Sequence, residues 1–165
     1  MHGAAVRGPR RRARRALGVH RGWTENPTYE EVTAGGTGHY EAVEVRYDPV
    51  RVSYERLLEV FWQNVDPTDP TGQFCDRGDS YRTAIFVGDA AERRAAEASK
   101  AALEASGRLP QGVVTPILDA MPFYVAEEYH QDFARRNPVR YRAYRAGCQR
   151  DSRLRALGVA ESGGH

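Results

Sequence analysis

Cysteine is scarce in this chain of 165 residues, which contains only Cys75 and Cys148. Two cysteines are too few for a disulfide-rich secreted scaffold, so we expect the reducing environment of the cytoplasm. Long apolar runs are also missing, and none approaches the ~18 residues that a membrane-spanning helix needs. We therefore predict a protein that does not enter the membrane and that builds its own core, as a single domain of this length can.

The first 22 residues lack several residue types. They contain no Asp, Glu, Cys, Ser, Phe, Tyr or Trp, and seven of them are Arg. The lack of Ser argues against a transit peptide, and the apolar stretch at 16–19 is too short for a secretory or twin-arginine signal. A basic arm could bind phosphate groups without sequence specificity. We predict instead that residues 1–22 are solvated and disordered.

The remainder of the chain is mildly acidic. Of the 24 basic residues, 17 lie beyond residue 22, and they face 22 acidic residues, which leaves a net charge of −5 there. The high overall pI of 8.6 is therefore no evidence for nucleic-acid binding by the body of the protein. Nucleic-acid binding through the arginine arm remains a remote alternative. We predict a domain at 23–157 and a flexible tail at 158–165.

Apolar periodicity predicts alternating strands and helices. Val43, Val45 and Tyr47 alternate with charged residues, as in a half-buried strand, and a helical apolar stripe follows Ser53, a suitable N-cap. The predicted elements are, in order, a strand at 42–48, a helix at 54–65, a strand at 83–87, a helix from 89 to about 106, an edge strand at 113–118 and a helix at about 126–136. This order predicts a two-layer α+β sandwich.

Two loops carry candidate functional residues. Glu41 lies where a glycine-rich loop enters a strand, and a carboxylate there could act as a proton donor or could simply be solvated. The loop does not have the lysine of a phosphate-binding loop. The stretch "CDRGDSYR" brings Cys75, Asp76 and Tyr81 together. Tyr81 could offer its hydroxyl to a polar substrate atom while Asp76 fixes the loop, although both residues also suit an ordinary turn.

Cys148 lies in the arginine-rich stretch "RYRAYRAGCQRDSR". Nearby positive charge favours the thiolate, which is the form that attacks disulfides and sulfenic acids. A flexible C-terminal tail could carry this sulfur to a partner. An inert tail thiol is the alternative.

Six ordered stretches resemble one known family, the A-type peptide-methionine (S)-S-oxide reductases. They are "ENPTYEEV", "GTGHYEAVEVRYDP", "SYERLLEVFWQNVDPTD", "GQFCDRGDSYRTAIF", "MPFYVAEEYHQDF" and "NPVRYRAYRAGC". The resemblance implies a mixed sheet with a ferredoxin-like core and a monomeric cytosolic repair enzyme. It also implies reduction of the S epimer of methionine sulfoxide, free or in oxidised proteins, with no bound cofactor or metal and with thioredoxin or another dithiol as reductant.

The resemblance also implies roles for single residues. In the family a thiolate attacks the sulfoxide sulfur, methionine leaves, and a resolving cysteine converts the resulting sulfenic acid into a disulfide. Glu41 matches the acid that protonates the sulfoxide oxygen, and Tyr81 matches a hydroxyl donor to the same oxygen. Asp76 matches a supporting carboxylate, Cys148 the resolving cysteine, and His130 a substrate-binding residue.

One departure from the family concerns the N-terminal part. The family's nucleophile lies in an upstream Gly-Cys-Phe-Trp motif, and its Gly-Tyr-Thr-Gly-Gly stretch falls on residues 18–22 here, where tyrosine is absent. We therefore expect the fold to lack its first strand and first helix. The codons GGG-GTA-CAC-CGG-GGG would encode residues 18–22, and read one base later they encode Gly-Tyr-Thr-Gly-Gly. We interpret residues 1–21 as the wrong reading frame of an ordinary reductase.

Three hypotheses for activity follow. The chain descends from an active reductase; or it is a catalytically dead remnant that still binds sulfoxides through Glu41 and Tyr81; or Cys75, the neighbour of Asp76, substitutes as the nucleophile.

Overall fold

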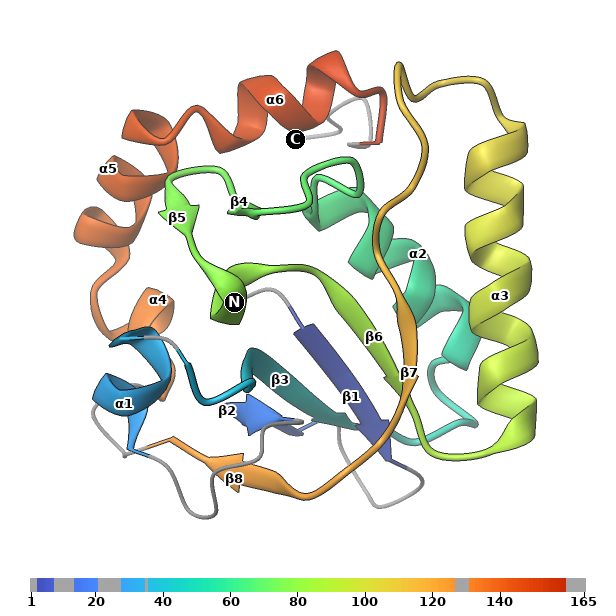
Figure 1. Cartoon of the computed structure of the whole chain (residues 1–165), viewed down its shortest axis with the longest axis horizontal. Helices are drawn as coiled ribbons and strands as arrows, with labels where there is room; N and C mark the ends of the chain where they lie inside the picture. The colour runs from blue at the N-terminus through green and yellow to red at the C-terminus, as the bar shows by residue number, and fades with distance from the viewer. Residues whose placement is uncertain (1–2, 8–13, 21–27, 35, 127–130, 160–165) are drawn as a thin grey trace.

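The structure is a computed structural model, and it describes residues 3–7, 14–20, 28–34, 36–126 and 131–159. Its centre is a mixed six-stranded sheet in the order β7-β6-β1-β3-β2-β8 (Figure 1). Parallel pairs join β1 to β3 and β6, and β6 to β7, while β2 is antiparallel to β3 and β8. The strands are β1 (Gly3–Arg7), β2 (Arg14–His20), β3 (Tyr40–Arg46), β6 (Ala84–Val87), β7 (Ile117–Asp119) and β8 (Phe123–Val125).

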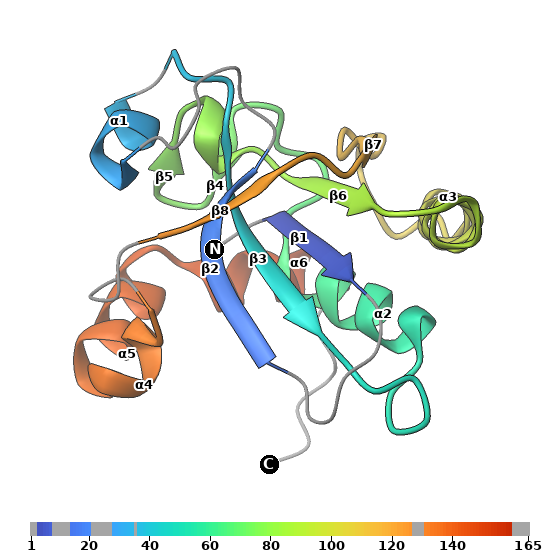
Figure 2. The ribbon, with the colours of Figure 1, turned by 90° about the horizontal axis from the view of Figure 1, so that it is seen from below.

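The N-terminal strands correct two predictions. Part of the segment that we expected to be disordered forms β1 and β2, and β1 fills a central position between β3 and β6 rather than being absent (Figure 2). A central strand is held by backbone hydrogen bonds on both edges, and β1 itself (Gly-Ala-Ala-Val-Arg) contains only one of the arginines of this segment. Residues 8–13, between the two strands, lie outside the described residues.

Two helices predicted from periodicity are confirmed. Helix α2 (Tyr54–Asn64) begins after Ser53, whose Oγ accepts from the backbone N–H of Arg56 at 3.1 Å. Helix α3 (Ala90–Ala105) begins after Asp89, whose side chain accepts from the N–H of Glu92. The Glu92 carboxylate in turn accepts from the N–H of Gly88 at 2.7 Å, so the first turn of α3 is capped reciprocally.

The main core lies between these helices and one face of the sheet. Buried side chains from α2, α3 and β6 pack there, and Phe86 points to the other face with Tyr40 and Ala84, as alternation along a strand requires. The buried members of the main core are Tyr47, Tyr54, Leu58, Trp62, Val65, Ile85, Val87 and Ala96. This packing anchors β6, and Tyr47 directly after β3, against α2 and α3.

The short elements are those that periodicity missed. The loop at 66–80 contains a hairpin of β4 (Gly72–Gln73) and β5 (Asp76–Arg77), followed by the 3₁₀ helix η1 (Asp79–Tyr81). Near the N-terminus lies α1 (Tyr29–Ala34). The strand predicted at 113–118 is shorter and later, as β7, but it does lie at a sheet edge.

The C-terminal third also differs from its prediction. Within the described residues the last predicted helix is reduced to α4 (Phe133–Arg136). Helix α4 ends before Pro138, as predicted, and Pro138 begins a further helix, α5 (Pro138–Gly147), since proline suits the first helical position. Helix α6 (Arg150–Ala156) follows, and Val159 is buried with Leu154. The ordered domain thus reaches residue 159, into the tail that we expected to be flexible.

Candidate functional site

The two cysteines are bonded to each other. Cys75 lies in the turn of the β4–β5 hairpin and Cys148 at the end of α5, with a separation of 73 residues and a Cα–Cα distance of 5.3 Å. That distance is ordinary for a disulfide. Cys148 therefore lies at the end of a helix and not on a flexible tail, which corrects our prediction. The pairing with Cys75 was not predicted, because nothing local in the sequence reports it.

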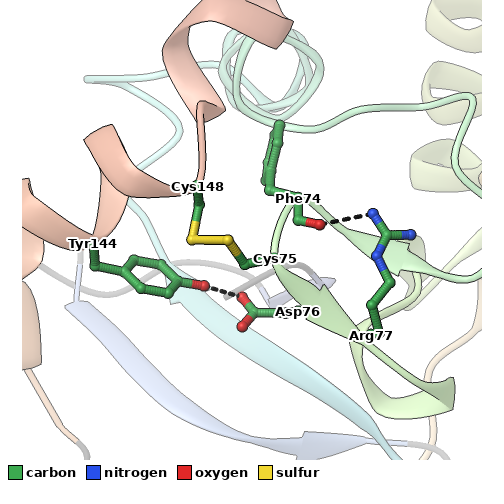
Figure 3. The surroundings of a disulfide bond; sticks show 6 residues. All are labelled: Phe74, Cys75, Asp76, Arg77, Tyr144 and Cys148. Atoms are coloured by element: carbon green, nitrogen blue, oxygen red, sulfur yellow. Dashed lines mark hydrogen bonds between the residues drawn. A yellow bond between two sulfur atoms is a disulfide. The ribbon is translucent and has the colours of Figure 1, made fainter.

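The hairpin that carries Cys75 is tightly held. A Cβ on Gly72 would lie 2.2 Å from the carbonyl oxygen of Asp76, so only glycine fits there. Arg77 donates to the carbonyl of Phe74 at 2.7 Å (Figure 3). It also forms an ion pair with Asp69 at 2.6 Å. The position of Cys75 therefore depends on backbone packing and on one arginine that spans the turn.

Asp66 links this hairpin to α6. Its backbone N–H donates to the side-chain oxygen of Gln73 at 2.8 Å, and Gln73 donates back to the Asp66 carbonyl. The Asp66 carboxylate accepts from Arg153 at 2.7 Å, and Asp66 and Gln73 are both buried. Buried polar groups of this kind are costly unless bonded, so the network fixes the hairpin against α6.

Tyr144 makes a second contact between the cysteine-bearing segments. Its hydroxyl donates to the carboxylate of Asp76, the residue after Cys75, and the ring points directly at that carboxylate in Figure 3. Burial and then this hydrogen bond raise the pKa of Tyr144 above its ordinary value, and the negative charge of Glu41 adds to the effect. Tyr144 was missed in the sequence. The available signal was its position one helical turn before Cys148.

The other predicted residues are placed as follows. Glu41 lies on β3 with only 5% of its surface exposed, close enough to act electrostatically on Tyr144. Tyr81 is half-buried at the end of η1, which lies against β3. Asp76 lies beside the disulfide. His130 lies outside the described residues. The structure thus brings Asp76 and Tyr144 beside the disulfide, with Glu41 close enough to act on Tyr144 and the segment of Tyr81 next to the strand of Glu41, while neither Glu41 nor Tyr81 lines the cavity beside the disulfide.

The arginines around Cys148 have specific partners. Arg145 pairs with Asp151, and Arg153 pairs with Asp66. Arg150 lies with its guanidinium 4.6 Å from the ring centroid of Phe74 and donates to a backbone carbonyl of α2. Burial, with the charge of Arg145, lowers the pKa of Arg150. The positive charges predicted to favour a thiolate are therefore largely engaged in attaching α5 and α6.

A cavity of about 520 Å³ opens beside the disulfide. Its wall includes both cysteines, Phe74, Arg77 and Arg153. Small-molecule sites commonly have volumes of about 300–1,000 Å³. The disulfide is therefore accessible to a thiol that enters from solvent.

Two kinds of feature are absent from the part of the chain that the structure describes. No group of three or more His, Cys, Asp or Glu side chains there is arranged to hold a metal ion. No helix there is long and apolar enough to cross a membrane.

Comparison with known proteins gives a consistent result. Residues 14–160 match the family model described as "Peptide methionine sulfoxide reductase", where we had predicted a domain at 23–157. A protein of Bacillus licheniformis named peptide methionine sulfoxide reductase MsrA is 54% identical over 133 residues, which cover 81% of this chain and 74% of the relative. A protein of the same name from Listeria innocua is 55% identical over 129 residues, covering 78% and 73%.

Solved structures agree with the sequence relatives. Mxr1 from Saccharomyces cerevisiae in its reduced form superimposes with a TM-score of 0.70 at 27% identity, covering 76% of this chain and 71% of that one. Methionine sulfoxide reductase A of Corynebacterium diphtheriae gives a TM-score of 0.65 at 33% identity, covering 76% and 64%. The mixed-sheet α+β fold is therefore that of these enzymes.

Proposed function

The chain belongs to the peptide methionine sulfoxide reductase family, and we propose that it reduces methionine (S)-sulfoxide through a relay between its own two cysteines. Cys75 is the nucleophile and Cys148 the resolving residue. The observation that carries this proposal is the disulfide between them, which is the product that such a relay leaves behind. Of the three hypotheses for activity, the bonded pair favours the one in which Cys75 attacks the substrate.

The chemistry balances with these two thiols. The Cys75 thiolate attacks the sulfoxide sulfur and forms an S–S bond, while the S–O bond breaks and the oxygen, protonated twice, leaves as water. A water molecule then attacks the Cys75 sulfur, which breaks the S–S bond, releases methionine and a proton, and leaves Cys75 as a sulfenic acid. The Cys148 thiol then condenses with the sulfenic acid, releasing water and forming the disulfide. An external dithiol returns the pair to two thiols and is itself oxidised to a disulfide. The net reaction converts one sulfoxide and one dithiol into methionine, a disulfide and water.

Protons for the departing oxygen come from Glu41 and Tyr81 in this scheme. Glu41 is the acid that protonates the sulfoxide oxygen, and Tyr81 donates a hydrogen bond to the same oxygen. Asp76 supports the loop next to the nucleophile, and His130 contributes to substrate binding. The burial of Glu41 supports its assignment, because a proton donor in a water-poor site acts on a developing charge with little screening.

The reductant is thioredoxin or another dithiol, and the substrate is methionine sulfoxide, free or in oxidised proteins. The cavity beside the disulfide supports both, because it gives solvent access to the sulfurs. A disulfide that must be reduced in every turnover suits the cytoplasm, where dithiol reductants are maintained. No bound cofactor takes part in this scheme.

The test uses the purified full chain with dithiothreitol and separate epimers of a methionine sulfoxide peptide. We expect turnover of the S epimer and none of the R epimer. Cys75→Ser abolishes turnover, by roughly a thousand-fold or more. Cys148→Ser releases one equivalent of methionine per chain and then stops when thioredoxin is the reductant.

A matched pair of carboxylates tests the proton donor. Glu41→Gln lowers kcat/KM about a hundred-fold, in the range of lost general acid catalysis. Glu44→Gln leaves it unchanged, since Glu44 lies on the same strand but is paired with Arg46. If no methionine appears with the unmodified chain, the relay is excluded, and the chain is at most a binder of sulfoxides through Glu41 and Tyr81.

A further inference from the structure

Two contacts join the same two segments of the chain. The Cys75–Cys148 disulfide is one, and the hydrogen bond from Tyr144 to Asp76 is the other. Asp76 follows Cys75 directly. Tyr144 lies one helical turn before Cys148, and the N–H of Cys148 donates to the Tyr144 carbonyl at 2.9 Å. The hydrogen bond thus lies beside the disulfide and restrains the same relative movement.

Backbone strain lies on both sides of the disulfide. Phe74, before Cys75, has a φ of 55°, and Gln149, after Cys148, has a φ of 52°. Left-handed backbone of this kind is unfavourable for residues with a Cβ atom. When the disulfide is open, relaxation of either residue would move its neighbouring sulfur. A contact that persists in the dithiol state and lies next to both cysteines then helps to keep the sulfurs facing each other, in addition to the Arg150–Phe74 contact and the Asp66 network.

The Tyr144–Asp76 hydrogen bond is suited to hold the two cysteines close together in the dithiol state. It does not involve sulfur, so it survives reduction of the cysteines. Its acceptor is a carboxylate, and bonds to charged acceptors are the stronger ones. Helix α5 itself has no buried residue, so apolar packing contributes little to its placement.

We propose that Tyr144 is a positioning residue, which holds Cys148 within reach of Cys75 while the disulfide is open and so speeds the resolution of the sulfenic acid. This inference rests on the proposed function for its role in turnover. The step that it accelerates is the condensation of the Cys75 sulfenic acid with the Cys148 thiol, which releases water and needs no further oxidant. Coupling between two contacts is reciprocal. The hydrogen bond therefore raises the equilibrium constant for forming the disulfide by the same factor by which the disulfide raises that for forming the hydrogen bond.

The first test measures the effective concentration of the two thiols, from the equilibrium of the Cys75–Cys148 pair with mixtures of reduced and oxidised glutathione. We expect Tyr144→Phe to lower it roughly ten-fold, as for the loss of one hydrogen bond to a charged group. Tyr54→Phe is the matched control and leaves it unchanged, because the buried Tyr54 hydroxyl has no hydrogen-bond partner within the described residues. In an Asp76→Ala background, Tyr144→Phe has no further effect.

The second test separates positioning from a general structural role. Tyr144→Phe should release the first equivalent of methionine at the normal rate, while the sulfenic acid, trapped with dimedone, persists roughly ten times longer. Hydrogen exchange in α2 and α3 of the reduced protein should stay as in the unsubstituted chain. A merely structural role would instead slow both steps and raise exchange throughout the reduced protein.

The outcomes decide the two proposals separately. An unchanged effective concentration in Tyr144→Phe overturns the positioning role, whatever the activity. A lowered effective concentration in a chain that reduces no sulfoxide supports the positioning role and refutes the relay. Tyr144 is partly exposed, with 40% of its surface accessible, so the variant is expected to fold.

Discussion

Helices α2 and α5 have nearly equal lengths, 11 and 10 residues, but they are attached to the protein in opposite ways. Helix α2 buries Tyr54, Leu58 and Trp62 in the main core, and the Trp62 indole also donates to Ser99 of α3 at 3.0 Å. Helix α5 buries no residue. It is attached by the disulfide, the Tyr144–Asp76 bond and arginine contacts, on the side of the molecule away from α3, whereas α6 also buries Leu154 in an apolar cluster that includes Leu103 of α3 (Figures 1 and 2).

This difference separates a permanent part of the molecule from a part that can change. Apolar packing does not depend on the redox state of sulfur. The attachment of α5 does, because one of its contacts is a bond that the proposed reaction makes and breaks. Segments that move in function commonly come from the least stable parts of a fold. The contrast predicts that redox state changes α5 and leaves α2 and α3 as they are.

The largest effect is expected from opening the disulfide. Cys148→Ser should lower the free energy of unfolding by about 4 kcal/mol relative to the oxidised chain, as expected for a loop of this length. Hydrogen exchange should rise in α5 and stay unchanged in α2. The unsubstituted chain in excess reductant is the control and should behave like the variant. Equal increases in both helices would contradict the contrast.

A core substitution should act independently of redox state. Leu58 is 3% exposed, so Leu58→Ala should cost about 3 kcal/mol of unfolding free energy through lost burial and a residual cavity. Denaturant unfolding should give the same loss in the oxidised and the reduced protein. Val60→Ala on the same helix is the control, because Val60 is 42% exposed and should change stability by less than about 0.5 kcal/mol. A loss that depends on redox state would show that the two regions are coupled.

Relief of strain beside Cys148 should give a smaller gain. Gln149→Gly should raise the free energy of unfolding by about 0.5–1 kcal/mol, because glycine adopts a positive φ without steric cost. Ala143→Gly within α5 should do the opposite, by about the same amount. Denaturant unfolding of both variants tests this pair. A loss of stability in Gln149→Gly would mean that the Gln149 side chain matters more than its backbone conformation.

The smallest effects concern the pH dependence of stability. Burial alone would raise the pKa of Asp69, but hydrogen bonds from Thr71 and Arg77 outweigh it and hold the pKa below its ordinary value. The contribution of Asp69 to the free energy of unfolding is therefore complete above the ordinary pKa of the carboxyl group. It is lost as the pH falls through the lowered pKa of the folded state. Burial raises the pKa of Glu92. The contribution of Glu92 to the free energy of unfolding therefore falls as the pH rises from its ordinary pKa to the raised pKa of the folded state.

Two substitutions separate these opposite effects of pH on the free energy of unfolding. Asp69→Asn, beside the cysteine hairpin, should reduce the loss of stability in acid. Glu92→Gln, at the start of α3, should remove the decline at higher pH. Denaturant unfolding between about pH 3 and pH 6 measures both, since carboxyl groups titrate in this range. If the free energy of unfolding of a variant depends on pH as in the unsubstituted chain, the pH dependence comes from other carboxylates.

The sequence alone predicted the elements whose signals are local. The apolar stripe and Ser53 predicted α2, and Asp89 with Glu92 predicted the start of α3. Family motifs predicted the mixed-sheet fold and pointed to the hairpin loop and to Cys148. Each of these signals lies within a few residues along the chain, where periodicity and capping act.

Only the tertiary structure decided the rest. It placed an arginine-rich, aromatic-free segment in the middle of the sheet, because ladder hydrogen bonds use the backbone and need no side-chain pattern. It joined Cys75 to Cys148 across 73 residues and Tyr144 to Asp76 across 68. Such contacts depend on where the core holds two distant segments. The residue types of the site could therefore be recognised in the sequence, but their partners could not.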